Sequence, residues 1–276
     1  MAPTRMKTEP ERSGDPLFGV VTGLYLALLA TPPVVFAVGR LVTSDGAVLY
    51  GTTVSAATAV VGLGWLTTAR VDDLAPRVGA TRLRWTLAVL PVGYALLGFV
   101  ALDVAGVVAI LAFFFGTGAM VGGFVLGVMA RTRHAVTVLD DVETECEFRA
   151  GWPSAAKHRL GLVAAAATAL AFGCFLAGTF TDRMLLQYVG QLLIPVGLVS
   201  YTSAEPRTFT VSSAGLEQRL PVARRLVGWD AFDGYSRTAD ALVLHRRWRL
   251  DHRFALADID DPDAVGAAIG RYLPAA

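Results

Sequence analysis

Six long apolar stretches, separated by polar connections, dominate the chain between Leu17 and Ala204. None of them contains a charged residue, and most have the roughly 20 residues that an α-helix needs to cross about 30 Å of hydrocarbon. Because only a backbone that satisfies its own hydrogen bonds is stable in lipid, we interpret the stretches as membrane-spanning helices. The predicted spans are residues 17–38, 47–68, 85–102, 104–130, 160–181 and 184–204.

The boundary between the third and fourth predicted spans depends on one residue. Asp103 is the only charge between Trp85 and Ala130. An uninterrupted helix of these 46 residues would be about 69 Å long at roughly 1.5 Å per residue, far longer than the bilayer is thick. We therefore expect the chain to turn at Asp103.

After Arg207 the pattern changes to short strand-like runs. Thr208–Val211 and Leu216–Leu220 flank a turn that contains Gly215, which predicts a β-hairpin. Asp261-Pro262 predicts the start of a helix, because Asp is a good N-cap and Pro suits the first helical position. The fold predicted for residues 205–276 is a small β-barrel or sandwich capped by one helix, attached to a polytopic α-helical membrane protein. Its other predicted strands are residues 224–229, 235–238, 241–248 and 249–256.

Composition and charge support a membrane protein and predict its orientation. Hydrophobic residues make up 54% of the chain and charged residues 17%, against about 25% charged in a typical soluble domain. Of the 24 lysines and arginines, 22 lie on one side of the predicted spans, and Arg40 and Arg183 lie on the other. Because cytoplasmic segments are enriched in positive residues, both termini are predicted to be cytoplasmic. Only two of the 24 are lysines, which is typical of a GC-rich prokaryotic genome. The sequence thus predicts a multi-pass plasma-membrane protein with three main cytoplasmic parts: residues 1–16, a polar loop at 131–159 and a domain at 205–276.

The C-terminal region resembles a known family. It combines a hairpin that opens Phe-Thr-Val-x-x-x-Gly-Leu at Phe209 with Val-Gly-Trp-Asp-x-Phe-x-Gly-Tyr over residues 227–235, a Leu-Val-Leu strand and a terminal helix. These features resemble the bacterial and archaeal PH-like domains that follow transmembrane helices. The resemblance covers about residues 206–274. It implies a PH-like fold that contacts a protein or the membrane surface and has no enzymatic activity of its own.

Four arginines near the end of the chain are candidates for that contact, and they are Arg246, Arg247, Arg249 and Arg253. Near an anionic leaflet each basic residue contributes about 1 kcal/mol of attraction. If the strand is unbroken, alternation places three of them on one face, which suits a surface that meets lipid headgroups. Two other interpretations stay open: ordinary solvated strand faces, or docking onto the acidic residues of segment 140–147. The tail has no nucleic-acid-binding motif, so no nucleic acid is expected as a partner.

Within the spans, the sequence offers packing residues and amides but no ionisable group well inside a helix. Gln187 and Gln191 are four residues apart and could line a polar path or hydrogen-bond a neighbouring helix. Small residues spaced by four permit close helix approach, and the candidates are Gly118, Gly122, Gly123 and Gly127.

The polar loop contains His134, Cys146 and His158, whose spacing matches no standard metal site. We therefore expect no catalytic residue, metal or cofactor. The function predicted is a non-enzymatic integral membrane protein that displays a cytoplasmic PH-like module to a protein partner or to the membrane surface. The alternative is a small transporter or channel with a polar path near Gln187 and Gln191.

Overall fold

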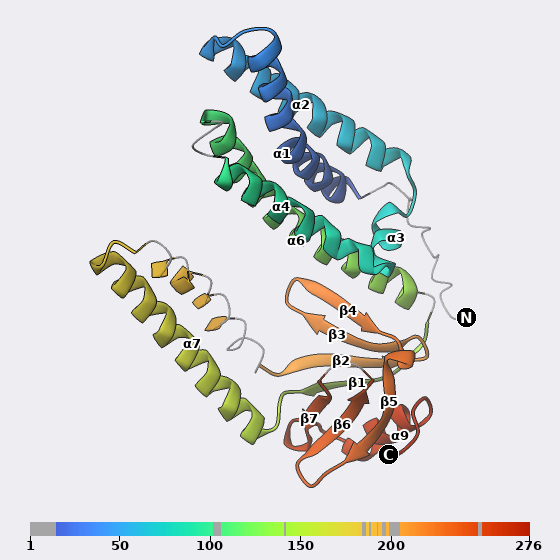
Figure 1. The fold of residues 1–276 in the computed structure, drawn as a ribbon. Coiled ribbons are helices and arrows are strands. Elements are labelled where there is room, and N and C mark those ends of the chain that lie inside the picture. Colours follow the sequence, from blue (N-terminus) through green and yellow to red (C-terminus); the bar gives the residue numbers. More distant parts are fainter. Residues whose placement is uncertain are drawn as a thin grey trace. The chain divides into compact units, whose positions relative to one another are not determined.

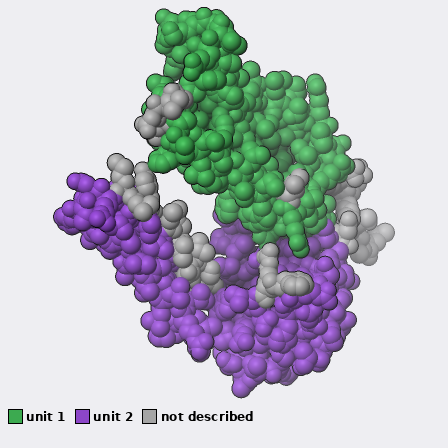
Figure 2. All heavy atoms as spheres, in the orientation of Figure 1, with its two compact units in different colours: residues 1–137 green, residues 138–276 purple. Residues whose placement is uncertain are grey.

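The computed structural model describes two compact units, Met1–Thr137 and Val138–Ala276 (Figure 2). We describe each unit by itself. The residues whose structure is described are 15–101, 106–140, 142–183, 186–187, 189–191, 193–194, 197–198, 205–247 and 250–276.

The first unit is helical. The helices α1 and α2 lie in contact, and the short helix α3 and a 3-10 turn lead into α4 (Figure 1). The last helix of the unit, α6, extends three residues beyond its boundary. The bounds are α1 Pro16–Leu41, α2 Gly46–Arg70, α3 Leu74–Ala80, η1 Arg82–Trp85, α4 Thr86–Val100 and α6 Val107–Asp140.

Aspartates define where α1 and α2 begin. The carboxylate of Asp15 accepts hydrogen bonds from the backbone N–H groups of Leu17 and Phe18, at 3.2 and 3.3 Å. Asp45 does the same for the first turn of α2, at 2.9 and 3.1 Å. These side chains satisfy N–H groups that have no partner within the helix, so each helix begins directly after its aspartate.

Among the described residues, four helices are long and apolar enough to cross a membrane: α1, α2, α6 and α7 (Ser154–Phe180). They correspond to the predicted spans 17–38, 47–68, 104–130 and 160–181, although α6 begins at Val107 and α7 ends at Phe180. The predicted span 85–102 corresponds to α4, which is apolar but has 15 residues, fewer than the roughly 20 needed to cross.

Two parts of the prediction fall on undescribed residues. Asp103, where we expected the turn, lies outside the described residues, and so does much of the predicted span 184–204. The described residues between Leu186 and Leu198 are helical.

The prediction of a polar loop over residues 131–159 is wrong. The helix α6 continues to Asp140, because no glycine or proline interrupts it, and α7 begins at Ser154. Between them lies the strand β1, Thr144–Ala150. Its Phe148 and Ala150 are buried while Glu147 and Arg149 are exposed, which is the alternation of a strand with one face on a core.

The second unit contains two antiparallel sheets, of order β1-β2-β3-β4 and β5-β6-β7 (Figure 1). The first strand comes from residues before α7, so the predicted domain 205–276 lacks one strand of its own sheet. In the described part of the chain no strand ladder joins the two sheets, so they form a sandwich and not a closed barrel. The remaining bounds are β2 Arg207–Ser212, β3 Gly215–Leu220, β4 Ala223–Val227, β5 Phe232–Arg237, β6 Ala241–Arg246, β7 His252–Ala255 and α9 Pro262–Gly270.

Both sheets and α9 share one core. Phe148 and Phe209 from the first sheet pack against Phe254 from the second, with ring centroids 5.4 and 4.7 Å from that of Phe254. The helix α9 adds Ile269, which is fully buried. The predicted cap of this helix is confirmed, because Asp261 accepts a hydrogen bond from the N–H of Ala264 at 2.9 Å.

Candidate functional site

The glycines proposed for helix packing lie along α6 and face two different neighbours. A Cβ built on Gly123 would lie 2.0 Å from the carbonyl oxygen of Leu87 in α4. A Cβ on Gly127 would lie 3.3 Å from the carbonyl oxygen of Arg84. At Gly123 the helix backbones therefore approach so closely that no side chain fits.

Gly118 and Gly122 face α1, and each has more room for an added methyl group than Gly123 has. The atoms nearest to their added Cβ positions belong to side chains, Leu28 at 3.5 Å and Tyr25 at 3.9 Å. Those are ordinary van der Waals distances. These two glycines permit contact with α1 but do not require the absence of a methyl group.

Sequence reasoning missed two further positions between α4 and α6. A Cβ on Gly98 would lie 2.5 Å from the backbone nitrogen of Phe113, and one on Gly116 would lie 2.7 Å from that of Ala95. Gly116 and Gly123 are seven residues apart, two helical turns, so they repeat on the same face of α6. This seven-residue spacing of glycines is the sequence pattern that could have predicted the close contact between α4 and α6.

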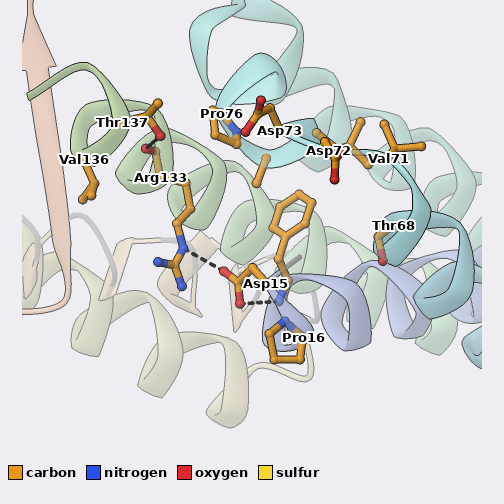
Figure 3. Close-up of a pocket in the computed structure, with 13 residues that line it drawn as sticks. Asp15, Pro16, Thr68, Val71, Asp72, Asp73, Pro76, Arg133, Val136 and Thr137 are labelled. Carbon is orange, nitrogen blue, oxygen red and sulfur yellow. Dashed lines mark hydrogen bonds and ion pairs between the residues drawn. The ribbon is translucent and has the colours of Figure 1, made fainter. Parts of the chain in front are cut away.

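A pocket of about 360 Å³ opens in the first unit where α1, the α2–α3 turn and α6 come together (Figure 3). Asp15 lines it, and the Nε of Arg133 donates to the Asp15 carboxylate at 2.7 Å. The same carboxylate caps α1, so it joins the start of α1 to α6. Asp72 and Asp73 also line the pocket from the turn.

The acidic residues of this pocket do not form a metal site. Among the residues described, no group of three or more His, Cys, Asp or Glu side chains could hold a metal ion. Asp15 is committed to its arginine and to the helix start. We therefore assign the Asp15–Arg133 pair a structural role in the first unit.

The histidines and the cysteine of the predicted polar loop lie on separate elements. His134 is on α6 in the first unit, whereas Cys146 is on β1 and His158 is on α7 in the second. Burial and the neighbouring Glu145 raise the pKa of the Cys146 thiol. A thiol with a raised pKa carries little thiolate at neutral pH, so it is a poor nucleophile and a poor metal ligand.

The two glutamines of the last predicted span differ in their surroundings. A Cβ on Gly178 of α7 would lie 2.7 Å from both the backbone nitrogen and the Cγ of Gln187. Gln187 is half-buried by this contact, whereas Gln191 is exposed. The geometry of Gln187 is that of a residue packed against a neighbouring helix.

The predicted arginine surface is divided between two strands. The guanidinium of Arg246 lies over the ring of Phe232, 5.6 Å from its centroid, and Arg247 is exposed and pairs with Asp233 at 3.2 Å. Arg253 is exposed on β7, opposite Val243. Arg249 lies outside the described residues. The condition of an unbroken strand, under which three of these arginines would share one face, is not met, because β6 ends at Arg246 and β7 begins at His252.

Acidic residues of β1 pair with arginines other than these four. Glu145 accepts from Arg271 at 3.0 Å and from the hydroxyl of Tyr272. Glu147 accepts from Arg219 at 3.1 Å. The acidic segment thus attaches β1 to β3 and to the end of α9.

A second pocket, of about 170 Å³, lies between the two sheets at one end of their shared core. Three arginines line it from three strands, Arg207 on β2, Arg225 on β4 and Arg253 on β7. Of the described residues that line it, Glu205 is the one carboxylate. The pocket therefore has an excess of positive charge.

His252 also lines this pocket and is neutral at physiological pH. Burial, and then the charges of Arg246 and Arg225, lower its pKa to about 4, while Asp251 opposes the shift. Its ring stacks on Phe254, with centroids 6.1 Å apart and planes 11° from parallel. In the neutral form, its Nε2 can accept a hydrogen bond from the guanidinium of Arg246, 3.4 Å away.

Comparison with protein-family models, with curated proteins and with solved structures found no match to this chain. The functional argument therefore depends on the geometry of the two units.

Proposed function

We propose that this chain is a non-enzymatic integral membrane protein whose second unit carries a PH-like module that contacts the cytoplasmic surface of the membrane. The meander of two antiparallel sheets followed by one C-terminal helix supports the PH-like assignment. The observation that carries the proposal is the short connection between this sandwich and an apolar helix.

Only three residues connect β1 to α7. The strand ends at Ala150 and the helix begins at Ser154, so these residues are at most about 15 Å apart at about 3.8 Å per residue. A module attached so closely to a membrane-spanning helix stays within reach of the headgroups. Its exposed arginines can then contribute about 1 kcal/mol each on an anionic leaflet.

The β1–β2 ladder supports two crossings between these strands. Ala150 and Arg207 are partners in that ladder, so the intervening segment starts and ends at the same place. The helix α7 has 27 residues and is about 40 Å long at about 1.5 Å per residue. If α7 crosses the bilayer, the chain must cross back before Arg207, and the predicted span 184–204 provides that return. We also propose α4 as a short third span of 15 residues, which would make six spans with both termini in the cytoplasm.

The proposal is tested with the full chain in lipid nanodiscs, either of phosphatidylcholine alone or with about one third phosphatidylglycerol. Hydrogen exchange of β6 and β7 should be slower on the anionic discs, because the module rests on the headgroups. Arg247→Glu should remove the difference. The matched control is Arg237→Glu, since Arg237 is also an exposed arginine paired with an aspartate, Asp263.

Two outcomes would contradict the proposal. Equal exchange on neutral and anionic discs would mean that the module does not rest on the charged surface. An equal effect of the two substitutions would mean that general charge, and not this surface, is responsible.

A further inference from the structure

Three side chains on the second sheet form a hydrogen-bonded chain from a hydroxyl through an imidazole to a carboxylate. The hydroxyl of Ser236 lies 2.8 Å from Nε2 of His245, and Nδ1 of the same ring lies 3.3 Å from a carboxylate oxygen of Asp251. This order of groups, and the ring nitrogen that each contacts, are those of the serine–histidine–aspartate triad of acyl-transfer enzymes. The three residues come from β5, β6 and the β6–β7 turn, so no sequence motif joins them.

The sheet itself brings Ser236 and His245 together. Leu242 and Leu244 of β6 belong to the shared core. The residues that alternate with them, Val243 and His245, therefore point to the opposite face. Ser236 is the partner of Val243 in the β5–β6 ladder, so it lies on that opposite face too, diagonally next to His245. The imidazole stands on the central strand of its sheet, which pairs on both sides and holds it in place.

The carboxylate of Asp251 determines which ring nitrogen of His245 carries a proton. Its other oxygen accepts a hydrogen bond from the backbone N–H of Arg246 at 3.2 Å, which fixes the side chain in the β6–β7 turn. A carboxylate only accepts, so the Nδ1 that faces it is the donor, and in the neutral ring Nε2 is left with a lone pair. That lone pair can take the proton of the Ser236 hydroxyl, which is the step that makes a serine nucleophilic.

A small reagent has access to these groups. The side chains of His245 and Asp251 are 35% and 31% exposed, and Ser236 is half-buried. Ser236 is also one of the residues that line a pocket of about 380 Å³ beside β5 and α9, and the small residues Gly266 and Ala267 form part of its lining. This volume lies within the roughly 300–1,000 Å³ of small-molecule sites. A small acyl donor therefore has room beside the strand that carries the serine.

We infer that Ser236 is an acylation site, which accepts an acyl group from a thioester and keeps it. Nε2 of His245 takes the hydroxyl proton while the Ser236 oxygen bonds to the carbonyl carbon of the donor. The carbon–sulfur bond then breaks, and the proton passes from His245 to the departing thiolate. Thioester and serine thus give a serine ester and a free thiol, with no further reactant. The inference goes beyond the proposed function, because it concerns a covalent modification and not a membrane contact.

The backbone at Ser236 accounts for an acyl group that stays in place. In serine proteases the N–H of the nucleophilic serine is one of the donors that stabilise the tetrahedral intermediate. Here the N–H and carbonyl of Tyr235 bond to Pro274 and Ala276, so by alternation those of Ser236 point the other way, to β6. Loss of one such donor slows acyl transfer by about 10²–10³-fold. A thioester compensates with a good leaving group and a serine ester does not, so the reaction stops at one acyl group per chain.

The test uses the full chain in a mild detergent and two activated donors, 4-nitrophenyl acetate and S-phenyl thioacetate. The intact mass should rise by one acetyl group, and tandem mass spectrometry of a digest should place that group on Ser236. Ser236→Ala should abolish this modification. His245→Gln should slow it by about a hundredfold or more, since a general base contributes roughly 10²–10⁴-fold. The matched control Ser213→Ala removes an exposed serine of the β2–β3 turn and should leave the rate at Ser236 unchanged.

Asp251 acts through His245, so it is a positioning residue and has its own measurement. Asp251→Asn keeps an acceptor for the N–H of Arg246 but no longer selects the ring tautomer. It should slow acetylation of Ser236 by about tenfold or more while the thermal unfolding midpoint stays at that of the wild type. Acetylation rates that fall only where the unfolding midpoint falls would mean that the three groups merely support the fold, and would overturn the inference.

Three further results would also overturn it. Acetyl groups on lysine or cysteine with none on Ser236 would mean that the hydroxyl is not activated. Equal rates in the wild type and in His245→Gln would mean that the imidazole is not the base. Release of nitrophenol beyond one per chain, absent in Ser236→Ala, would mean that the acyl group is hydrolysed and not kept. The membrane-surface role is tested separately, since Ser236→Ala should leave the exchange difference between neutral and anionic nanodiscs unchanged.

Discussion

Two adjacent glycines on α6 should respond in opposite ways to the same substitution. An added Cβ at Gly123 would lie 2.0 Å from the carbonyl oxygen of Leu87, while one at Gly122 meets nothing closer than Tyr25 at 3.9 Å. Both glycines lie in the same turn of the same helix. The comparison between Gly123→Ala and Gly122→Ala therefore isolates the helix contact from the change in helix propensity.

The expected magnitudes follow from these distances. Ordinary contact begins at 3.4 Å, so Gly123→Ala requires α4 and α6 to separate by about 1.4 Å at this point. Overpacking of this kind costs about 1–3 kcal/mol. Alanine is favoured over glycine inside a helix by about 1 kcal/mol, and that gain offsets part of the cost. Gly122→Ala gains the same helix propensity but causes no overpacking, because its added Cβ lies at an ordinary contact distance.

The assay is thermal unfolding of the full chain in a mild detergent, followed by circular dichroism. The midpoint of Gly123→Ala should fall by several degrees, and that of Gly122→Ala should stay or rise. If both variants shift in the same direction by the same amount, the close approach of α6 to α4 is refuted. Gly116→Ala provides an independent check, because its added Cβ would also lie within 3 Å of α4 backbone.

Three further predictions concern stability. Asp15→Ala should lower the free energy of unfolding by about 1–2 kcal/mol, since it removes both a helix cap and the ion pair with Arg133. Arg133→Ala removes the ion pair alone and should lower it by less than about 1 kcal/mol, so its thermal unfolding midpoint should fall less than that of Asp15→Ala. The pKa of His252 is about 4 in the folded state and 6.5 ordinarily, so the unfolded state takes up the proton first as pH falls. Neutral His252 therefore contributes up to about 3 kcal/mol to the free energy of unfolding above pH 6.5, and this contribution is lost as pH falls towards 4. His252→Phe should flatten this part of the dependence of unfolding free energy on pH, and an unchanged slope would contradict it. Phe148→Ala should cost about 3–5 kcal/mol in denaturant titrations while the exposed Arg149→Ala changes little; equal effects would mean that β1 is not part of the core.

The sequence predicted the elements that depend on local pattern. Four of the predicted spans correspond to long apolar helices, and the cap at Asp261 is where composition indicated it. The hairpin around Gly215 is also confirmed, with Ser212 and Gly215 paired at its end. Each of these features is decided by residues within a few positions of one another.

The features that the sequence did not predict depend on distant contacts. The strand β1 alternates over seven residues, but nothing local shows that its partner begins at Arg207, beyond a long apolar helix. Two of the three pocket arginines, Arg207 and Arg225, gave no signal either. Arg225 directly follows another arginine, and only the register shows which of the two faces the core. Charge density along the sequence singles out Arg247 and Arg253, both of which are exposed, and does not identify arginines that the sheets enclose.

In the proposed topology, the separation of β1 from β2 in the sequence links the assembly of the sandwich to membrane insertion. The 56 residues between Ala150 and Arg207 must have their ends together before the ladder forms. For a flexible chain of this length, loop closure costs about 3.6 kcal/mol beyond a constant. If α7 and the predicted span 184–204 insert side by side in the bilayer, as proposed, they hold those ends close and remove most of this cost. We therefore expect β1 to join the sheet after the helices insert. Before insertion, pairing of Ala150 with Arg207 would have to overcome the full entropic cost of closing the connecting segment.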